Sequence, residues 1–457
     1  MRLSAENAGR LSDAVSRPGY DRAQPFGIVH FGIGAFHRAH QAAYTDACLE
    51  AGESGWMIAG VSMRSATVAN QLNPQDGLCT LTVRSAAGNT TSLVGSIAQV
   101  LLAGTDREAI VARLASPDCH VASFTVTEKG YCRKPDGSLD LVKAREGFYP
   151  ILCDALGRRR DAGLPGLSLL SCDNLSANGK QLRHLMLEWI DAEAADLHGW
   201  FLANCTTPDS MVDRIVPSPS SADLNDLEQR IGMRDEGAVF TEAFTQWVIE
   251  DDFAGPRPSW ENHGVQIVPD VAPFETAKLR MLNGAHSLLA YVGQNCGHTF
   301  VHEAIADDRL RALVQRLMIE EAAPTIAAGD GQDLEAYACE LVTRFENPAL
   351  NHRLAQIAMD GSQKIYQRWL ATLAIQQQRG NSCEAILTAI AHWLKHVSGD
   401  VRQVEDPQER ALRELWQSAG QGGIVMAIFG RGGPLQSDWT PSETDIAIIE
   451  SRLQDLE

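Results

Sequence analysis

One mostly apolar stretch in the second half of the chain carries a lysine and a histidine, which can exchange protons, and an asparagine, which can donate a hydrogen bond. Lys278, Asn283 and His286 stand in the sequence ETAKLRMLNGAHSLLAY, which predicts a helix. At about 100° per residue, their side chains fall within an arc of roughly 140°, so one helix face presents all three. Burial lowers the pKa of a lysine, which can then act as a base near neutral pH. The structural alternative is a snorkelling lysine, a satisfied core asparagine and a lone buried histidine.

Polar residues that follow predicted strands form a second group of candidates. Asn174 comes after the apolar run 167–172, and Thr127 ends the run 120–127. Ligands gather at the carboxyl ends of strands in doubly wound sheets, so we expect Asn174 to meet the lysine helix across an interdomain cleft. Asp213, in the sequence MVDRI, is a further candidate. The alternatives are a plain polar turn at Thr127 and a structural ion pair at Asp213.

A glycine pair near the N-terminus indicates a dinucleotide site. Gly32 and Gly34 lie between a strand-type run, 26–31, and an amphipathic stretch, 35–49, which is where a Rossmann unit cradles a pyrophosphate. The full fingerprint has a third glycine, and His37 takes that position. An ordinary strand-to-helix turn is the alternative. The predicted cofactor-binding residues are Gly32, Gly34, Ala35, Phe36, Arg64 and Thr127.

The choice between NAD and NADP stays open from the residues alone. An acidic residue normally follows the second strand and reads the adenosine ribose. Here the run 56–62 is followed by Met63 to Thr67 without Asp or Glu. Arg64 faces either a 2′-phosphate or the adenine ring. NAD is the predicted cofactor, and NADP is not excluded.

The residues that other classes of dehydrogenase use for catalysis are not found in this sequence. None of the seven tyrosines has a lysine four positions later, and neither clustered zinc ligands nor an H-E-x-x-H sequence occurs. The ten cysteines are scattered, as expected for reduced thiols. The mechanism that is left for a dehydrogenase of this sequence uses no metal and has a lysine as its base.

The hydrophobic pattern predicts an α/β fold in two parts. Strand-type and helical stretches alternate in the first half, which predicts a parallel sheet covered by helices, with additional, antiparallel strands at 80–84 and 92–101. Later patterns are long and helical. We expect a Rossmann-type domain at 1–274 and an all-helical substrate domain at 275–457. The expected helices of the second part are 275–292, 310–321, 333–344, 354–373, 383–396 and 443–456.

Charge and hydropathy exclude several classes of function. The 39 basic and 58 acidic residues give a net charge of −19, which disfavours nucleic acid and anionic membranes as partners. Neither a secretory signal nor a membrane-spanning run is present, so we expect a cytoplasmic protein, either a monomer or a homodimer. An acidic protein that binds anionic ligands needs local positive charge. Arg38, Lys278, Lys364 and Arg368 are the expected sources.

Several long motifs together resemble the polyol-specific long-chain dehydrogenases, the mannitol dehydrogenase family. They cover essentially the whole chain: GIGAFHRAH at 32–40, SCDN at 171–174, SMVDRI at 210–215, QWVIED at 246–251, KLRMLNGAHS at 278–287 and DGSQK at 360–364. The resemblance implies metal-free hydride transfer between a secondary alcohol and a nicotinamide cofactor.

The same resemblance implies a role for each site residue. Lys278 matches the general base, and Asn174 and Asn283 match amides that bind the developing alkoxide. His286 matches the residue that orients the substrate, and Glu275 matches a carboxylate that passes the lysine's proton to solvent. The polar residues that match the substrate site are Asp213 and Lys364.

The substrate class follows from finer similarities. The sequences TEKGY at 127–131, DGSQK at 360–364 and Gln367-Arg368 resemble the hexuronate branch, the D-mannonate oxidoreductases, also called fructuronate reductases. Lys129, Lys364 or Arg368 would bind the substrate carboxylate; alternatively, they are surface charges common to all branches. Mannitol 2-dehydrogenase or a pentitol dehydrogenase is the second choice. A nucleotide-binding sensor is the non-enzymatic alternative, although a sensor has no need of a base.

Overall fold

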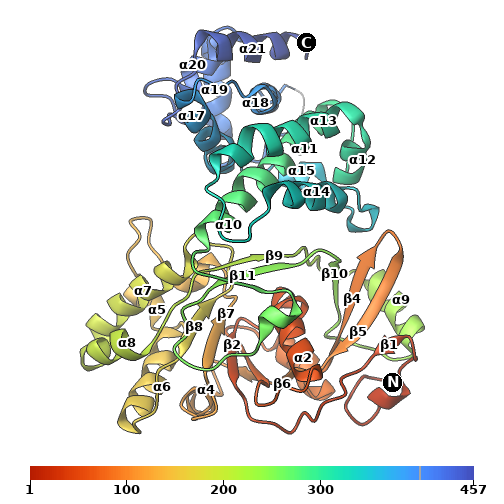
Figure 1. The fold of residues 1–457 in the computed structure, drawn as a ribbon, viewed down its shortest axis with the longest axis vertical. Coiled ribbons are helices and arrows are strands. Elements are labelled where there is room, and N and C mark those ends of the chain that lie inside the picture. The colour runs from red at the N-terminus through yellow and green to blue at the C-terminus, as the bar shows by residue number, and fades with distance from the viewer. Residues whose placement is uncertain (401–402, 457) are drawn as a thin grey trace. The chain divides into compact units, whose positions relative to one another are not determined.

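The computed structural model describes residues 1–400 and 403–456, which divide into two compact units, Met1–Val271 and Ala272–Glu457. The first unit is built on a five-stranded parallel sheet (Figure 1). Its order is β6 (Ile97–Leu102), β3 (Ile58–Ser62), β2 (Ile28–Phe31), β7 (Val121–Phe124) and β8 (Ser168–Ser171). The central strand is in register with both neighbours, since Ile28 pairs with Ile58 and with Val121.

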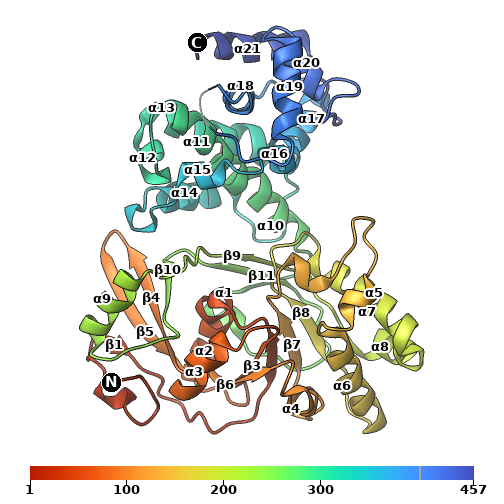
Figure 2. The same cartoon turned by 180° about the vertical axis from the view of Figure 1, so that it is seen from behind.

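Alternating side chains give this sheet two buried faces. Val29 and Phe31 pack against residues of the α4, α6 and α7 helices, whereas Ile28 of the same strand packs with residues of α2 and α3 (Figure 2). Successive residues of a strand point to opposite faces, and here both faces are covered. The helices of the first unit are α1 (Ala35–Ala39), α2 (Gln41–Glu50), α3 (Thr67–Leu72), α4 (Arg107–Leu114), α5 (Leu141–Ala144), α6 (Tyr149–Asp161), α7 (Asn178–Glu193), α8 (His198–Asn204) and α9 (Ser221–Ile231).

Two smaller sheets complete the first unit. One has the order β1 (Val15–Ser16), β5 (Gly88–Val94), β4 (Cys79–Ser85) and β10 (Val239–Glu242). The other has the order β12 (Gln266–Val268), β11 (Gln246–Glu250) and β9 (Ser210–Asp213), with β9 and β11 antiparallel.

Two predictions for this unit need correction. The helix expected over 35–49 is broken at His40, whose φ of −123° and ψ of −91° are not helical, and it forms the separate helices α1 and α2. The strand expected over 92–101 is two strands separated by Gly95 and Ser96. The first, β5, is antiparallel to β4 as expected, but the second, β6, joins the main sheet parallel to β3.

Helices are the regular elements of the second unit in residues 272–400 and 403–456, where Phe300 and Arg353 also form an isolated antiparallel bridge. Its α-helices are α10 (Ala272–Ala277), α11 (Gly284–Asn295), α12 (Val301–Ala306), α13 (Asp308–Gln315), α14 (Leu334–Phe345), α15 (Leu354–Ile357), α16 (Gly361–Ile365), α17 (Ala371–Gln378), α18 (Glu384–Val397), α19 (Glu409–Ala419), α20 (Ile424–Phe429) and α21 (Glu443–Gln454). Three π-helices, Lys278–Asn283, Arg316–Ala322 and Tyr366–Leu370, interrupt longer helices. The helix expected over 354–373 is consequently divided, and α12, α19 and α20 were not predicted. The expected fold class, a Rossmann-type domain followed by a helical one, is confirmed.

Glu321, in the second of these π-helices, holds the N-terminus of α18. Its buried carboxylate accepts the backbone N–H groups of Ala385 at 2.7 Å and of Ile386 at 2.9 Å. Burial, the largest cause, raises the pKa of Glu321 to about 7, although both hydrogen bonds and Arg316 oppose the shift. The carboxyl group of Glu321 therefore titrates near neutral pH.

We expect Glu321 to make the stability of the protein depend on pH. Because its folded-state pKa lies above its unfolded value, the folded protein binds the proton more tightly between about pH 4.5 and 7. The stability contributed by this group therefore falls as the pH rises through that window. The difference in Tm between the wild type and Glu321→Gln should therefore change with pH. The wild type should gain stability relative to the variant when the pH is lowered from 8 to 5. Glu320→Gln, at an exposed neighbour, is the control, and parallel wild-type and Glu321→Gln curves would contradict the assignment.

Candidate active site

The glycine turn after β2 is fixed by the backbone of Thr125, directly after β7. Gly32 has a φ of +93°, and a Cβ atom there would lie 2.1 Å from the carbonyl oxygen of Thr125. Only glycine fits this close approach. The N–H group of Gly34 then donates to the Gly32 carbonyl at 2.6 Å, and α1 begins at Ala35. The chain therefore leaves the sheet through a tight turn at the carboxyl end of β2.

A buried polar network supports this turn from beneath. His30 contacts Ser123 through Nδ1 and Thr125 through Nε2, both at 2.8 Å, and Thr125 Oγ1 donates to the Gly32 carbonyl at 2.8 Å. Since a threonine hydroxyl has one proton, Nε2 must donate to Thr125. Burial lowers the pKa of His30 to about 3, so the ring is neutral and Nδ1 accepts from Ser123. His37, at the position of the missing third glycine, is fully buried and stacks on His30 at 3.5 Å.

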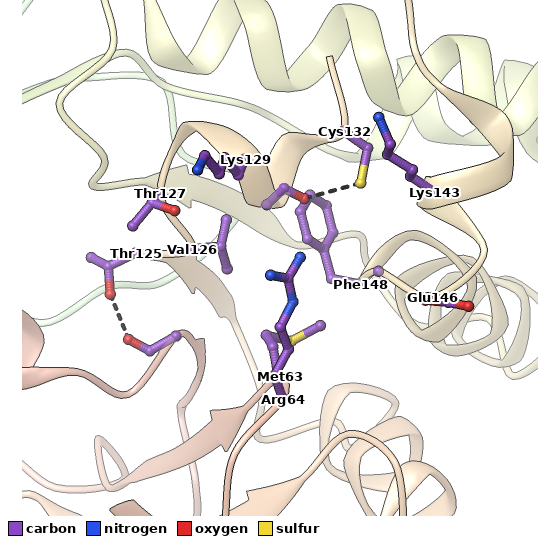
Figure 3. A pocket seen from close by; sticks show the side chains of 13 residues that line it. Met63, Arg64, Thr125, Val126, Thr127, Lys129, Cys132, Lys143, Glu146 and Phe148 are labelled. Carbon is purple, nitrogen blue, oxygen red and sulfur yellow. Dashed lines mark hydrogen bonds between the residues drawn. The ribbon is translucent and has the colours of Figure 1, made fainter. Parts of the chain in front are cut away.

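A cavity of about 620 Å³ opens at this edge of the sheet (Figure 3). The predicted cofactor residues Gly32, Arg64 and Thr127 line it, whereas Gly34, Ala35 and Phe36 continue the turn outside its lining. The other lining residues, which sequence reasoning did not assign to the cofactor, are Met63, Thr125, Val126, Lys129, Gly130, Cys132, Lys143, Glu146, Gly147 and Phe148. With three basic side chains and one acidic one, the cavity is a local basic site in an acidic protein. Its size, its glycine edge and its charge fit a dinucleotide.

Arg38 does not contribute to that basic site. We expected its charge to help attract the cofactor, but its side chain is buried and lies outside the lining of the cavity. Its Nη1 atom lies 3.5 Å from the carbonyl oxygen of Ile33. Burial lowers the pKa of Arg38, and Asp235 opposes that shift. Arg38 therefore belongs to the interior of the first unit.

Thr127 occupies a strained backbone conformation at the rim of the cavity. Its φ of 64° and ψ of 164° lie in a region that essentially only glycine adopts. Asp173 holds this segment, because its carboxylate accepts the N–H groups of Val126 at 3.0 Å and of Thr127 at 2.8 Å. The hydroxyl of Tyr131 also donates to Asp173, at 2.9 Å. Sequence reasoning singled out the motif around Asp173 for Asn174 alone and missed this supporting carboxylate.

We expect glycine to be better tolerated than alanine at position 127. Thr127→Gly relieves a strain of about 1–3 kcal/mol and costs about 0.5–1 kcal/mol of chain entropy, whereas Thr127→Ala keeps the strain. Both variants lose the hydroxyl group. The Thr127→Gly protein should therefore unfold at a higher temperature than Thr127→Ala in scanning calorimetry. The reverse order would show that the positive φ is not imposed by the fold.

Asn174 follows β8 of the five-stranded sheet, and Asp213 is the last residue of β9 in the three-stranded sheet. The amide nitrogen of Asn178 donates to the carbonyls of Asp173 at 2.9 Å and of Ser210 at 2.8 Å, and it thereby ties the end of β8 to the start of β9. Asn174 is exposed beside this tie, and Asp213 is buried at the end of β9. The structure thus places Asn174 beside the start of β9, the strand that ends in Asp213.

The lysine helix of the second unit differs from the continuous α-helix that we expected. Lys278–Asn283 form a π-helix, after which α11 resumes the α-helical spacing. In a π-helix the backbone hydrogen bonds join residues five apart, so residues at this spacing are about one turn apart. Lys278 and Asn283 therefore lie on nearly the same face of the helix. His286 lies three residues further along an α-helix and shares that face. The π turn therefore aligns the three predicted residues more closely than a regular helix would, and π turns are frequent at functional sites.

Glu275, Lys278 and His286 are placed by the same helical segment. Glu275 is half-buried in α10, three residues before Lys278, which is the spacing of side chains on one face. Lys278 and His286 are 8% and 9% exposed. Burial, together with the nearby charges of His352, Arg344 and Arg368, holds the pKa of His286 well below its ordinary value. His286 is therefore neutral at physiological pH.

Arg368 brings a positive charge to this helix. Its Nη1 atom donates to Ser287 Oγ at 2.6 Å, next to His286. Burial lowers its pKa to about 10, and among residues 1–400 and 403–456 no carboxylate oxygen lies within ion-pair distance of its guanidinium. Lys364 donates to the carbonyl of Met359 at 2.5 Å and lies 3.9 Å from Asp360. Within the described residues of the second unit, Arg368 is therefore a half-buried guanidinium without a carboxylate partner. Arg280 is a second one, and its Nη1 atom donates to the carbonyl and the hydroxyl group of Thr325.

Neither a metal-ligand cluster nor a membrane-spanning helix is present in the described residues. No group of three or more His, Cys, Asp or Glu residues is arranged to hold a metal ion among residues 1–400 and 403–456. Within the same residues, no helix combines the length and the apolar character needed to cross a membrane.

Comparison with protein families accounts for both units. The model of the mannitol dehydrogenase Rossmann domain matches residues 26–262, and that of the mannitol dehydrogenase C-terminal domain matches residues 270–428. The chain belongs to the mannitol dehydrogenase family. The resemblance seen in the sequence is thereby confirmed at the level of the family, and the protein is a nicotinamide-dependent dehydrogenase of that family. The predicted domain bounds and the roles of the individual site residues stay predictions.

Individual members of the mannitol dehydrogenase family match along nearly the whole chain. The "Uncharacterized oxidoreductase YeiQ" of Escherichia coli (strain K12) is 41% identical over 98% of this chain and 95% of its own length. The D-mannonate oxidoreductase of the same organism is 36% identical over 97% and 96%. The Pseudomonas fluorescens mannitol 2-dehydrogenase, solved as a ternary complex with NAD and D-mannitol, is 34% identical with a TM-score of 0.80 over 100% and 97%.

Proposed function

We propose that this protein is a sugar-acid dehydrogenase that interconverts D-mannonate and D-fructuronate with NAD(H). The observation that carries the proposal is Arg368, a half-buried guanidinium beside His286 and Ser287 with no carboxylate partner among the described residues. Such a charge is costly unless a ligand neutralises it, and a guanidinium matches the planar geometry of a carboxylate. A D-mannonate oxidoreductase that is 36% identical places this substrate class within the family, but mannitol 2-dehydrogenases reach the same identity, so Arg368 alone carries the choice.

The lysine helix supplies the proton chemistry of this proposal. A bound nicotinamide would supply the acceptor for the hydride of the alcohol carbon. Lys278 takes the proton of the hydroxyl group, and the amide of Asn283, on the same helix face, donates a hydrogen bond to the oxygen as its charge develops. Neutral His286 orients that oxygen. Glu275, one helical turn before Lys278, carries the proton from the lysine toward solvent.

The remaining predicted residues keep the roles that the resemblance gives them. Asn174 is the second amide donor, and Asp213 binds substrate hydroxyl groups. Gly32, Arg64 and Thr127, which line the cavity of the first unit, would hold the cofactor. No metal takes part in this scheme.

Reduction of paired substrates tests the proposal. D-Fructuronate and D-fructose differ mainly in the carboxylate, so their kcat/KM values with NADH compare the two candidate activities directly. We expect D-fructuronate to be strongly preferred. Mannitol 2-dehydrogenase activity is the second candidate, because a mannitol 2-dehydrogenase aligns over 100% of this chain. A clear preference for D-fructose would establish that activity and reject the sugar acid.

A further inference from the structure

The loop after β3 lacks the acidic residue that selects NAD. β3 ends at Ser62, and the next acidic residue in the chain is Asp76. In Rossmann domains a carboxylate at the end of this strand accepts hydrogen bonds from the adenosine ribose. The same carboxylate repels the 2′-phosphate of NADP. Here the corresponding residues are Met63 and Arg64, both of which line the cavity.

Arg64 is available for an anionic ligand. Its side chain points from the end of β3 into the cavity (Figure 3). Within the parts of the chain that the structure describes, 1–400 and 403–456, its guanidinium has neither a hydrogen bond nor an ion pair. Five N–H donors are therefore free to bind phosphate oxygens.

Internal hydrogen bonds hold the loop that carries Arg64. Ser62 Oγ donates to the carbonyl of Ser65 at 2.6 Å. Ser65 Oγ contacts Thr67 Oγ1 at 2.7 Å and accepts the N–H group of Thr67 at 3.1 Å. Because both sides of Arg64 are tied, its backbone is positioned before any ligand binds, which reduces the entropy lost on binding.

Other charges of the cavity also favour an anion. Lys129 and Lys143 line it together with Arg64, and Glu146 is the one acidic residue in the lining. Lys143 lies 3.1 Å from Asp140, so its charge is partly compensated. Arg64 is therefore the positively charged lining residue at the end of β3, where a Rossmann domain normally has the acidic residue that binds the ribose.

We propose that Arg64 binds the 2′-phosphate of NADP(H), so that this chain binds NADP(H) about as tightly as NAD(H). The proposal rests on the binding of a nicotinamide dinucleotide in this cavity but not on the identity of the sugar substrate. The competing role for Arg64 is stacking on the adenine ring, which NAD and NADP share. The two roles predict different responses to removal of the guanidinium.

Binding measured without any sugar substrate distinguishes these roles. NADH and NADPH are titrated into the wild type, Arg64→Ala and Arg64→Asp. Lys134→Ala, which removes an exposed positive charge outside the lining of the cavity, is the control. We expect wild-type Kd values for the two cofactors within about tenfold of each other. Arg64→Ala should weaken NADPH binding by roughly 10- to 100-fold, as expected for a lost charge-assisted contact, and NADH binding by less than about threefold. Arg64→Asp should exclude NADPH while NADH still binds.

Competition with nucleotide fragments provides a second measurement. In the wild type, 2′,5′-ADP should displace bound NADH more effectively than 5′-AMP, and Arg64→Ala should abolish that difference. An equal loss of NADH and NADPH affinity in Arg64→Ala would overturn the proposal in favour of adenine stacking. Tight NADH binding with NADPH excluded from the wild type would overturn it as well. Failure to bind either cofactor would instead reject the proposed function itself.

Discussion

Replacement of Lys278 by alanine is expected to lower turnover by roughly 10²- to 10⁴-fold, the contribution typical of a general acid–base group. Lys278 is 8% exposed and lies at the start of the π-helix that aligns it with Asn283. Alanine removes the amine without adding bulk. Steady-state assays with D-fructuronate and NADH, and separately with D-fructose, measure the loss for both candidate substrates.

Binding and rescue measurements separate the chemical role of Lys278 from a structural one. NADH affinity should stay within about threefold of the wild type, because the predicted cofactor residues lie in the other unit. Added methylamine should restore part of the turnover of Lys278→Ala, since it supplies the missing amine. Lys395→Ala, which alters a lysine of α18 far along the sequence, is the matched control and should keep full activity. Normal turnover in Lys278→Ala would reject the mechanism.

The sequence predicted the chemical residues of the lysine helix but not the geometry that aligns them. The residue types and their apolar surroundings single out Lys278, Asn283 and His286 as candidates. A regular helix, however, spreads them over an arc of roughly 140°. The π turn over Lys278–Asn283 depends on tertiary packing: Gly284 lies against the backbone of Arg368, and Trp369 Nε1 donates to the Gly284 carbonyl at 3.2 Å. Local propensity carries no signal for contacts with residues more than 80 positions away.

The sequence predicted those parts of the cofactor-binding domain that depend on contacts between residues close in the chain. The strand, the glycine turn and the parallel sheet follow from short-range patterns, and the fold class is confirmed. The support from Asp173 was not predictable, because its carboxylate reaches backbone groups 46 and 47 residues earlier in the chain. The interior position of Arg38 was missed for a related reason. Its place in α1, the helix that follows the glycine turn, predicted a contact with the cofactor. Only the packing shows that the side chain is buried in the core.

Replacement of Arg368 by leucine is expected to reduce kcat/KM for D-fructuronate by roughly 10- to 150-fold, which corresponds to a lost charged hydrogen bond of about 1.5–3 kcal/mol. Reduction of D-fructose should change far less, because that substrate has no carboxylate. Arg368→Lys keeps the charge but not the planar pair of donors, so we expect an intermediate loss. The ratio of the two kcat/KM values is the informative quantity, since a general loss of folding cancels in it.

The surroundings of Arg368 provide a sharper test of the same role. Ser287→Ala removes the 2.6 Å hydrogen bond that orients the guanidinium while leaving its charge in place. If Arg368 binds the substrate carboxylate, this change should raise KM for D-fructuronate with little effect on kcat, since the lysine helix keeps its base. Equal losses for D-fructuronate and D-fructose in both variants would mean that Arg368 acts through packing. The half-buried charge would then serve the fold of the second unit, and the substrate would be a neutral polyol or ketose.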